Sequence, residues 1–272
     1  MLPLHYRAAV HWQSRAVLLR HLRVYIRNWY TAFLPPAMEP VLFLLAFGLG
    51  LGVHVAGISH GGHEVSYASY IAPGMLAYTT FLTPFFQSLF GAFIRMHYQK
   101  TWEGQLTSQI ALPHVIWGEQ LWAALLATMY VTIVLAVIAI CQSFGLVHLD
   151  LMRLLPVPLV SFVFALGFSA LALLFTAILP TIDHMNLPVF LVALPLGFTS
   201  NTYFPMPTEH PAVAVLMYCN PLYHLAEGYR ALALGGDGMT HLGIGAIQVT
   251  GLVIILVPII NRRLRRRVLG EG

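Results

Sequence analysis

Apolar segments long enough to cross a lipid bilayer recur along the chain, and they constrain its fold more than any other feature. A helical crossing needs about 20 mostly apolar residues, because the hydrocarbon core is roughly 30 Å thick. Of the 272 residues, 58% are hydrophobic and 9% are charged, whereas soluble domains average about 25% charged residues. The sequence therefore predicts an all-α polytopic membrane protein made of one domain, residues 1–272. We expect six membrane spans, at residues 31–54, 67–95, 115–143, 152–179, 187–202 and 241–260.

The basic residues are distributed unevenly, and their positions predict the orientation of the chain. Twelve of the 14 Lys and Arg residues fall within residues 1–28, within the loop after the second span, or in the tail at 262–267. Such residues accumulate on the cytoplasmic side of membrane proteins, so we expect both termini in the cytoplasm. The net charge of +4 therefore reflects orientation and gives no indication of nucleic-acid binding.

Residues 1–28 form a basic segment in which arginines alternate with apolar residues at helical spacing. The pattern predicts an amphipathic helix that lies in the plane of the headgroups. A simple positive anchor for the next span is the alternative, and both descriptions can hold together.

Residues 96–119 are the one long polar stretch inside the chain that carries both signs of charge. Hydrocarbon cannot satisfy its donors and acceptors, so this stretch lies at a water-facing surface, and the distribution of charge puts it in the cytoplasm. Trp102 and Leu106, four residues apart on a helix, would present an apolar contact to a partner protein. An interfacial loop with a tryptophan at headgroup level is the alternative.

Residues 203–236 fit neither a span nor a simple loop. Prolines divide them into two apolar pieces of about ten residues, too short to cross, which predicts a re-entrant helical hairpin outside the cytoplasm. Glu227 and Arg230 are three residues apart and are expected to pair on one helix face.

Carboxyl and aromatic groups in or near the spans are candidates for a substrate path. Glu39 and Glu119 lie near span ends, where they either line the path or pair with basic residues such as Arg23 and Arg27. The aromatic rings either form an apolar wall or pack between helices. The candidate path residues are Glu39, Phe81, Phe85, Phe86, Glu119, Phe198, Asn201 and Tyr203.

Several kinds of chemistry lack their sequence motifs. There is no G-x-x-x-x-G-K-[ST] loop for nucleotide phosphates and no H-E-x-x-H, and we assign neither catalytic nor metal-binding residues. His54, His60 and His63 cluster in the first external loop, where solvated side chains are the alternative to a metal site. Cys141 and Cys219 either pair near the outer face or stay free.

Six stretches, spread in order along almost the whole chain, carry a resemblance to a known family. They are EPVLFLLAFGLGLG at 39–52, YASYIAPGML at 67–76, KTWEGQLTSQIALP at 100–113, GEQLWAA at 118–124, YFPMP at 203–207 and NPLYHLAEGYRALALG at 220–235. Their order resembles the type-2 ATP-binding cassette (ABC) exporter permeases, and the resemblance is greatest to the NodJ group of lipo-oligosaccharide export permeases and their antibiotic-efflux relatives. One departure is TSNT at residues 199–202, where that family usually has a Ser-Gly pair.

The resemblance implies an ATP-driven exporter permease of the inner (plasma) membrane. Its partners would be a separate cytoplasmic ATPase, which holds ATP and Mg, and a second, identical permease subunit. Its substrate would be an amphipathic, lipid-linked saccharide. A hydrophobic natural product is the alternative substrate, and a membrane-embedded transferase or a secondary transporter is a less favoured class.

The resemblance also implies roles for two groups of residues. Within a cytoplasmic segment at 96–114, a coupling helix would dock on the ATPase, and the hairpin at 203–236 would form a lid over the exit. The coupling residues would be Gln99, Lys100, Thr101, Trp102, Glu103, Gly104, Gln105 and Leu106. The hairpin residues would be Pro205, Asn220, Pro221, Glu227 and Arg230.

Overall fold

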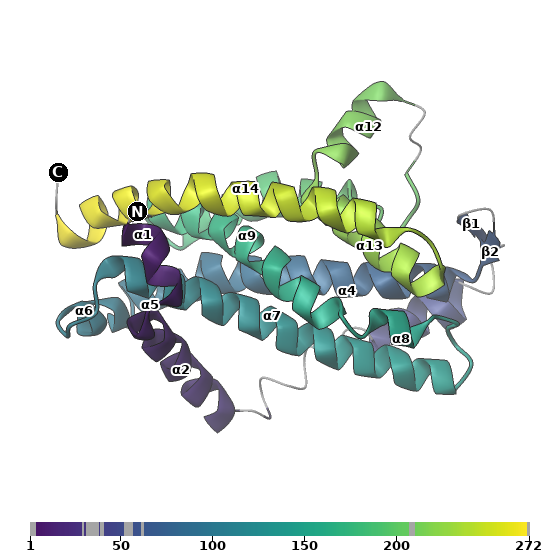
Figure 1. Cartoon of the computed structure of the whole chain (residues 1–272), viewed down its shortest axis with the longest axis horizontal. Coiled ribbons are helices and arrows are strands. Elements are labelled where there is room, and N and C mark those ends of the chain that lie inside the picture. Colours follow the sequence, from purple (N-terminus) through teal and green to yellow (C-terminus); the bar gives the residue numbers. More distant parts are fainter. Residues whose placement is uncertain are drawn as a thin grey trace.

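The computed structural model describes residues 4–28, 30, 38, 41–51, 57–60, 63–206 and 210–270. Long helices lie side by side along most of the length of the molecule (Figure 1). The expected helical class is confirmed, with a small antiparallel hairpin of β1 (Ile58–His60) and β2 (His63–Val65) beside it. Both termini and the short helix α6 (Thr101–Leu106) lie at one end of the bundle, which we call the termini end; β1 and β2 lie at the far end.

Three helical stretches in the described part of the chain are long and apolar enough to cross a membrane, which supports a membrane-embedded protein. They are Leu112–Ser143, Leu151–Ile178 and Gly238–Leu269, and they coincide with the third, fourth and sixth predicted spans. The corresponding elements are α7 (Leu112–Ser143), α8 (Leu151–Leu154), α9 (Val157–Ile178), α14 (Gly238–Leu264) and the π-helical turn η6 (Arg265–Leu269).

The other predicted spans are helical where they are described. The second is α4 (Tyr67–Phe86), which continues through the π-helical η3 (Gln87–Gly91) into α5 (Ala92–His97). The fifth comprises α10 (Asn186–Pro188), η5 (Val189–Ala193) and α11 (Leu194–Phe198), and it ends four residues before the predicted boundary. Of the first, η2 (Leu44–Leu51) is described, and Glu39 lies outside the described residues. The count of six spans stays a prediction.

The predicted N-terminal helix consists of α1 (Leu4–Arg7), η1 (Ala8–Val10) and α2 (Trp12–Arg27). The extended backbone of His11 separates η1 from α2. All five of its arginines are exposed, while Val17 and His21 are buried. Val10, Trp12 and Ile26 of the predicted apolar face are exposed, and the position of this segment in the headgroup plane stays a prediction. A Cβ on Gly118 of α7 would lie 2.4 Å from the side chain of Val17. The missing side chain at Gly118 therefore lets α2 approach α7 closely.

The core lies between α4, α7, α9, α14 and α13 (Pro221–Leu234). Phe81 of α4 and Phe168 of α9 meet edge to face at 4.9 Å, a favourable geometry for aromatic rings. Hydroxyl pairs reinforce this contact, with 2.9 Å between Oγ1 of Thr80 on α4 and Oγ of Ser161 on α9, and 2.7 Å between Oγ of Ser88 on η3 and Oγ of Ser169 on α9. Small polar residues of this kind commonly link helices inside membranes.

The segment at 203–236 contains two short helices, α12 (Pro211–Tyr218) and α13. Asn220 begins α13 by accepting a hydrogen bond from the Leu222 amide at 2.9 Å, and Pro221 follows at the first helical position. Helix α13 packs against α4 and α14, whereas α12 projects away from the bundle (Figure 1). The division at the prolines is confirmed, and re-entry into the membrane stays a prediction.

Candidate coupling site

Helix α6 is a polar helix held at the termini end of the bundle (Figure 1). It follows Lys100, whose backbone has a φ of 52°. This left-handed conformation is uncommon for a residue with a side chain, and here it makes the turn between α5 and α6. On the exposed side, Nζ of Lys100 and Oε1 of Glu103 form an ion pair at 2.7 Å. Glu103 and Gly104 face outward, and a Cβ on Gly104 would meet nothing within 4 Å.

The inner side of α6 is attached to a buried carboxylate. Nε1 of Trp102 donates to Oε1 of Glu119 at 2.9 Å, and both side chains are almost completely buried. Nε of Arg95 donates to both carboxylate oxygens of Glu119 at 3.0 Å. Nε2 of His21 lies 3.3 Å from Oε1. Side chains from α2, α5 and α6 therefore meet at one carboxylate on α7, and we call these four residues the Glu119 cluster.

This cluster corrects two expectations from the sequence. Trp102 was expected to present its ring to a partner protein, and that expectation was wrong for this structure because the ring is fully buried. Leu106, the other half of the expected apolar contact, packs against the core. Glu119 does pair with a cation, but its partner is Arg95 and not Arg23 or Arg27.

The outward surface of α6 is polar. Glu103, Gly104, Thr107 and Ser108 are exposed there, while the predicted coupling residue Gln105 is buried. Gln99 and Lys100 are exposed, and Thr101 is half-buried. The outward side of α6 therefore presents polar groups around Glu103. On its inner side, Trp102 attaches the helix to the bundle through Glu119.

A small hollow of about 240 Å³ lies beside α6. It is lined by Met96, His97, Lys100, Trp102, Glu103, Arg267 and Val268. Arg267 of η6 closes it by donating to the carbonyl oxygens of Thr176 at 2.8 Å and Leu179 at 2.7 Å. The basic tail is thereby fixed to the end of α9, since a cation there satisfies carbonyls that the helix leaves unpaired.

The far end of the bundle has a second buried charge, at Arg230 of α13. Nη1 of Arg230 binds Glu227 at 2.5 Å, as the spacing predicted. Nη2 donates to the carbonyl oxygen of Asn201 at 2.8 Å, and Nε donates to that of Tyr70 at 3.3 Å. The guanidinium also lies over the Tyr70 ring, 3.9 Å from its centroid. We call these residues the Arg230 cluster.

Asn201 completes the Arg230 cluster from the loop after α11. Its φ of 55° is left-handed, a conformation that asparagine tolerates better than most residues. Its side chain accepts from the Met206 amide at 2.9 Å and donates to Glu227 at 3.3 Å. Asn201 belongs to the TSNT segment at residues 199–202, so this segment connects α13 to the loop that precedes α12. Pro205, on that loop, is exposed.

The candidate path residues do not form one group in the described part of the structure, although the rings of Phe81, Phe85 and Phe86 contact one another. Phe81 and Phe85 are fully buried between helices, which is the packing alternative. Phe86 is 38% exposed and faces a cavity, and Phe198 is 73% exposed. Tyr203 packs on Tyr78 at 5.3 Å. Glu119 lies at the termini end, apart from Asn201 and Tyr203.

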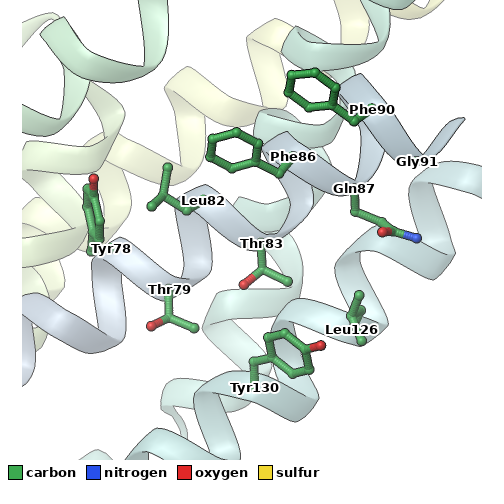
Figure 2. A pocket seen from close by; sticks show the side chains of 10 residues that line it. All are labelled: Tyr78, Thr79, Leu82, Thr83, Phe86, Gln87, Phe90, Gly91, Leu126 and Tyr130. Atoms are coloured by element: carbon green, nitrogen blue, oxygen red, sulfur yellow. The ribbon is translucent and has the colours of Figure 1, made fainter. Parts of the chain in front are cut away.

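Sequence reasoning missed a cavity of about 550 Å³ (Figure 2). It lies between α4–η3 and α7, and its residues share no local motif. Only the turn-by-turn spacing of Tyr78, Leu82, Phe86 and Phe90 along one helix face could have indicated it.

The candidate metal ligand His54 and the side chains of His60 and His63 lie outside the described part of the structure. Over the residues that the structure describes, no group of three potential metal ligands occurs. Cys141 is buried, Cys219 is exposed, and the two do not pair.

The described part of the chain has three helical stretches that are long and apolar enough to cross a membrane. This places the chain in the class of polytopic membrane proteins. Residues 13–234 match the family model described as ABC-2 type transporter. The chain therefore belongs to this family of membrane transport permeases, and the expected resemblance is confirmed.

Several curated relatives carry the name Nodulation protein J. The one from Rhizobium leguminosarum bv. viciae is 30% identical over 262 residues, which cover 91% of this chain and 96% of that protein. The one from Rhizobium leguminosarum bv. trifolii is 31% identical over 234 residues, 84% of this chain and 85% of that protein. The one from Rhizobium meliloti (strain 1021) is 27% identical over 258 residues, 93% and 94% of the two chains.

Proposed function

We propose that this chain is the permease subunit of an ATP-driven exporter that moves an amphipathic, lipid-linked saccharide outward across the inner membrane. The family and the relatives named Nodulation protein J support this proposal. The observation that carries it is the arrangement of α6, which is tied from behind to Glu119 and leaves a polar surface outward. A helix held in this way can pass a displacement to α2, α5 and α7 together, because all three contribute to the same buried cluster.

A separate cytoplasmic ATPase docks on the outward surface of α6 and holds the ATP and Mg that drive transport. A second, identical permease subunit completes the translocation path. The topology that we propose has six spans, both termini in the cytoplasm and a re-entrant hairpin at 203–236. The number of basic residues near both termini supports the orientation.

The test uses the full chain, purified alone and together with a co-expressed ABC ATPase subunit from the same organism. The chain alone is expected to hydrolyse no ATP, and the complex is expected to hydrolyse it. Inverted vesicles that contain both subunits are expected to accumulate a fluorophore-labelled acylated oligosaccharide when ATP is added. ATP hydrolysis by the isolated chain would contradict the division of labour. Accumulation of a hydrophobic antibiotic in place of the oligosaccharide would favour the efflux alternative.

A further inference from the structure

A continuous cleft runs along α4, η3 and α5, between these elements and α7. Its first part is the 550 Å³ cavity in Figure 2, and its second part is a cavity of about 340 Å³ next to α2. Both cavities are lined by Gln87 and Gly91, so they adjoin there. The first cavity is lined by Tyr78, Thr79, Leu82, Thr83, Phe86, Gln87, Phe90, Gly91, Leu126 and Tyr130. The second is lined by Arg20, His21, Val24, Tyr25, Gln87, Gly91, Ile94, Arg95, Gln99 and Trp122.

The two parts differ in polarity. Leu82, Phe86 and Phe90 line the first part, and in Figure 2 their side chains lie on the other side of α4–η3 from Leu126 and Tyr130. Arg20 and Arg95 line the second part, nearer the termini end. The apolar part extends from residue 78 to residue 91 of one helix, a length of about 20 Å at 1.5 Å per residue. One leaflet of a bilayer has about 15 Å of hydrocarbon. The apolar part is thus long enough for a lipid chain from one leaflet.

The charge at the second part is positive. Arg20 is exposed and forms no ion pair with any residue that the structure describes. Arg95 uses Nε and Nη2 on Glu119, and its Nη1 lies 3.2 Å from the carbonyl oxygen of Gln87 in that amide's favoured orientation. No acidic residue lines either cavity in the described chain. The charge of Arg95 is compensated by Glu119, so Arg20 supplies the positive charge at this end of the cleft that no described carboxylate pairs with.

Two features lie at the junction of the two cavities. A Cβ on Gly91 would lie 3.0 Å from the side-chain amide of Gln87 and 3.1 Å from Nη1 of Arg95, so glycine leaves room at this point. The Tyr25 hydroxyl of α2 and the Tyr130 hydroxyl of α7 form a hydrogen bond, and Tyr25 lines the second cavity whereas Tyr130 lines the first.

We propose that this cleft binds one anionic amphiphile from the leaflet at the termini end, with its phosphate or other anionic head at Arg20, beside Arg95. Its chain lies along Leu82, Phe86 and Phe90. A free anion could pair with Arg20 alone, but it would leave the apolar part empty, and a neutral amphiphile would leave Arg20 without an anionic partner. Binding at this site does not require export, so it can be tested independently of the proposed function.

Trp122 lines the charged part of the cleft and provides a local probe. The full chain is reconstituted in phosphatidylcholine vesicles that contain a small fraction of phosphatidylglycerol with brominated chains, which quench nearby tryptophans. The difference between the native chain and Trp122→Phe isolates the quenching of Trp122. We expect brominated phosphatidylglycerol to quench Trp122 more than brominated phosphatidylcholine at the same fraction.

Arg20→Gln is expected to weaken this preference about fivefold, as one basic residue near an anionic surface contributes about 1 kcal/mol. Arg20→Lys is expected to keep most of it. Arg23→Gln, an exposed arginine of α2 that does not line the cleft, is the matched control and is expected to change nothing. Equal quenching by the two lipids, or an unchanged preference in Arg20→Gln, would overturn the proposal. Competition by inorganic phosphate strong enough to remove the quenching would identify an anion site without a lipid and would also overturn it.

Discussion

The two ends of the bundle each bury one charged side chain, but the two charges have different kinds of partner. Glu119 at the termini end is 1% exposed and is held by side chains from three other helices. Arg230 at the far end is 0% exposed and is held by one carboxylate of its own helix and by two backbone carbonyls. Both charges are fully compensated, which their burial demands.

This difference suggests different mechanical roles. The contacts of the Glu119 cluster are between side chains of separate elements, so a movement of α6 can break and remake them. The Arg230 cluster includes backbone carbonyls of α4 and of the loop after α11, so α13 stays fixed to that loop. We infer that the termini end transmits movement, whereas the far end anchors the hairpin.

The largest expected effect is at Glu119. Glu119→Ala leaves the buried guanidinium of Arg95 without its partner, and it should lower the free energy of unfolding by about 3–5 kcal/mol. Thermal unfolding of the purified chain in detergent measures this change. Glu103→Ala, which removes an exposed carboxylate from the same region, is the control and should change stability by less than about 1 kcal/mol. Equal effects of the two variants would mean that the Glu119 cluster does not stabilise the termini end.

Arg230→Leu should have the next largest effect, about 3 kcal/mol, because Glu227 and two carbonyls lose their donor. Since α13 should then separate from its loop, proteolysis within residues 203–236 should become faster, while cleavage near α6 stays unchanged. Arg153→Leu removes an exposed arginine at the far end and is the control. Faster cleavage at α6 in Arg230→Leu would contradict the separate roles of the two ends.

Trp102→Phe keeps an aromatic ring and removes only the hydrogen bond to Glu119. A hydrogen bond to a charged group contributes about 1.5–3 kcal/mol, and the loss should lie near the lower value because Arg95 still binds the carboxylate. The double variant Trp102→Phe with Glu119→Gln should lose less than the sum of the single losses, because both changes remove the same contact. Additive losses would show that the two side chains are energetically independent.

Gly118→Ala is expected to lower the free energy of unfolding by about 1–3 kcal/mol, because the new methyl group would overlap Val17 and force α2 away from α7. Gly104→Ala is the matched control, since a Cβ there meets nothing within 4 Å. Thermal unfolding compares the two variants. A larger loss in Gly104→Ala would contradict the close contact between α2 and α7.

Much of the fold could be predicted from local patterns in the sequence. Apolar runs located the long helices, prolines located the break between α12 and α13, and a spacing of three residues predicted the pair of Glu227 and Arg230. These features depend on neighbours along one helix, where spacing fixes which side chains meet.

The candidate site was less predictable because it depends on contacts between elements. Spacing placed Trp102 and Leu106 on one side of α6, but it does not indicate which side faces the bundle. Arg95 and Glu119 are 24 residues apart on different helices, so no local pattern connects them. The cleft between α4 and α7 likewise exists only once the helices are packed.

Association with the ATPase tests the central claim most directly, namely that α6 docks through its exposed polar surface while Glu119 holds it from behind. The measurement is the amount of ATPase that co-purifies with Glu103→Lys, with Asp150→Lys at the far end as the charge-matched control. We predict that Glu103→Lys loses most of its ATPase with an unchanged unfolding temperature, and that Asp150→Lys retains it. Full retention of the ATPase by Glu103→Lys would contradict the claim.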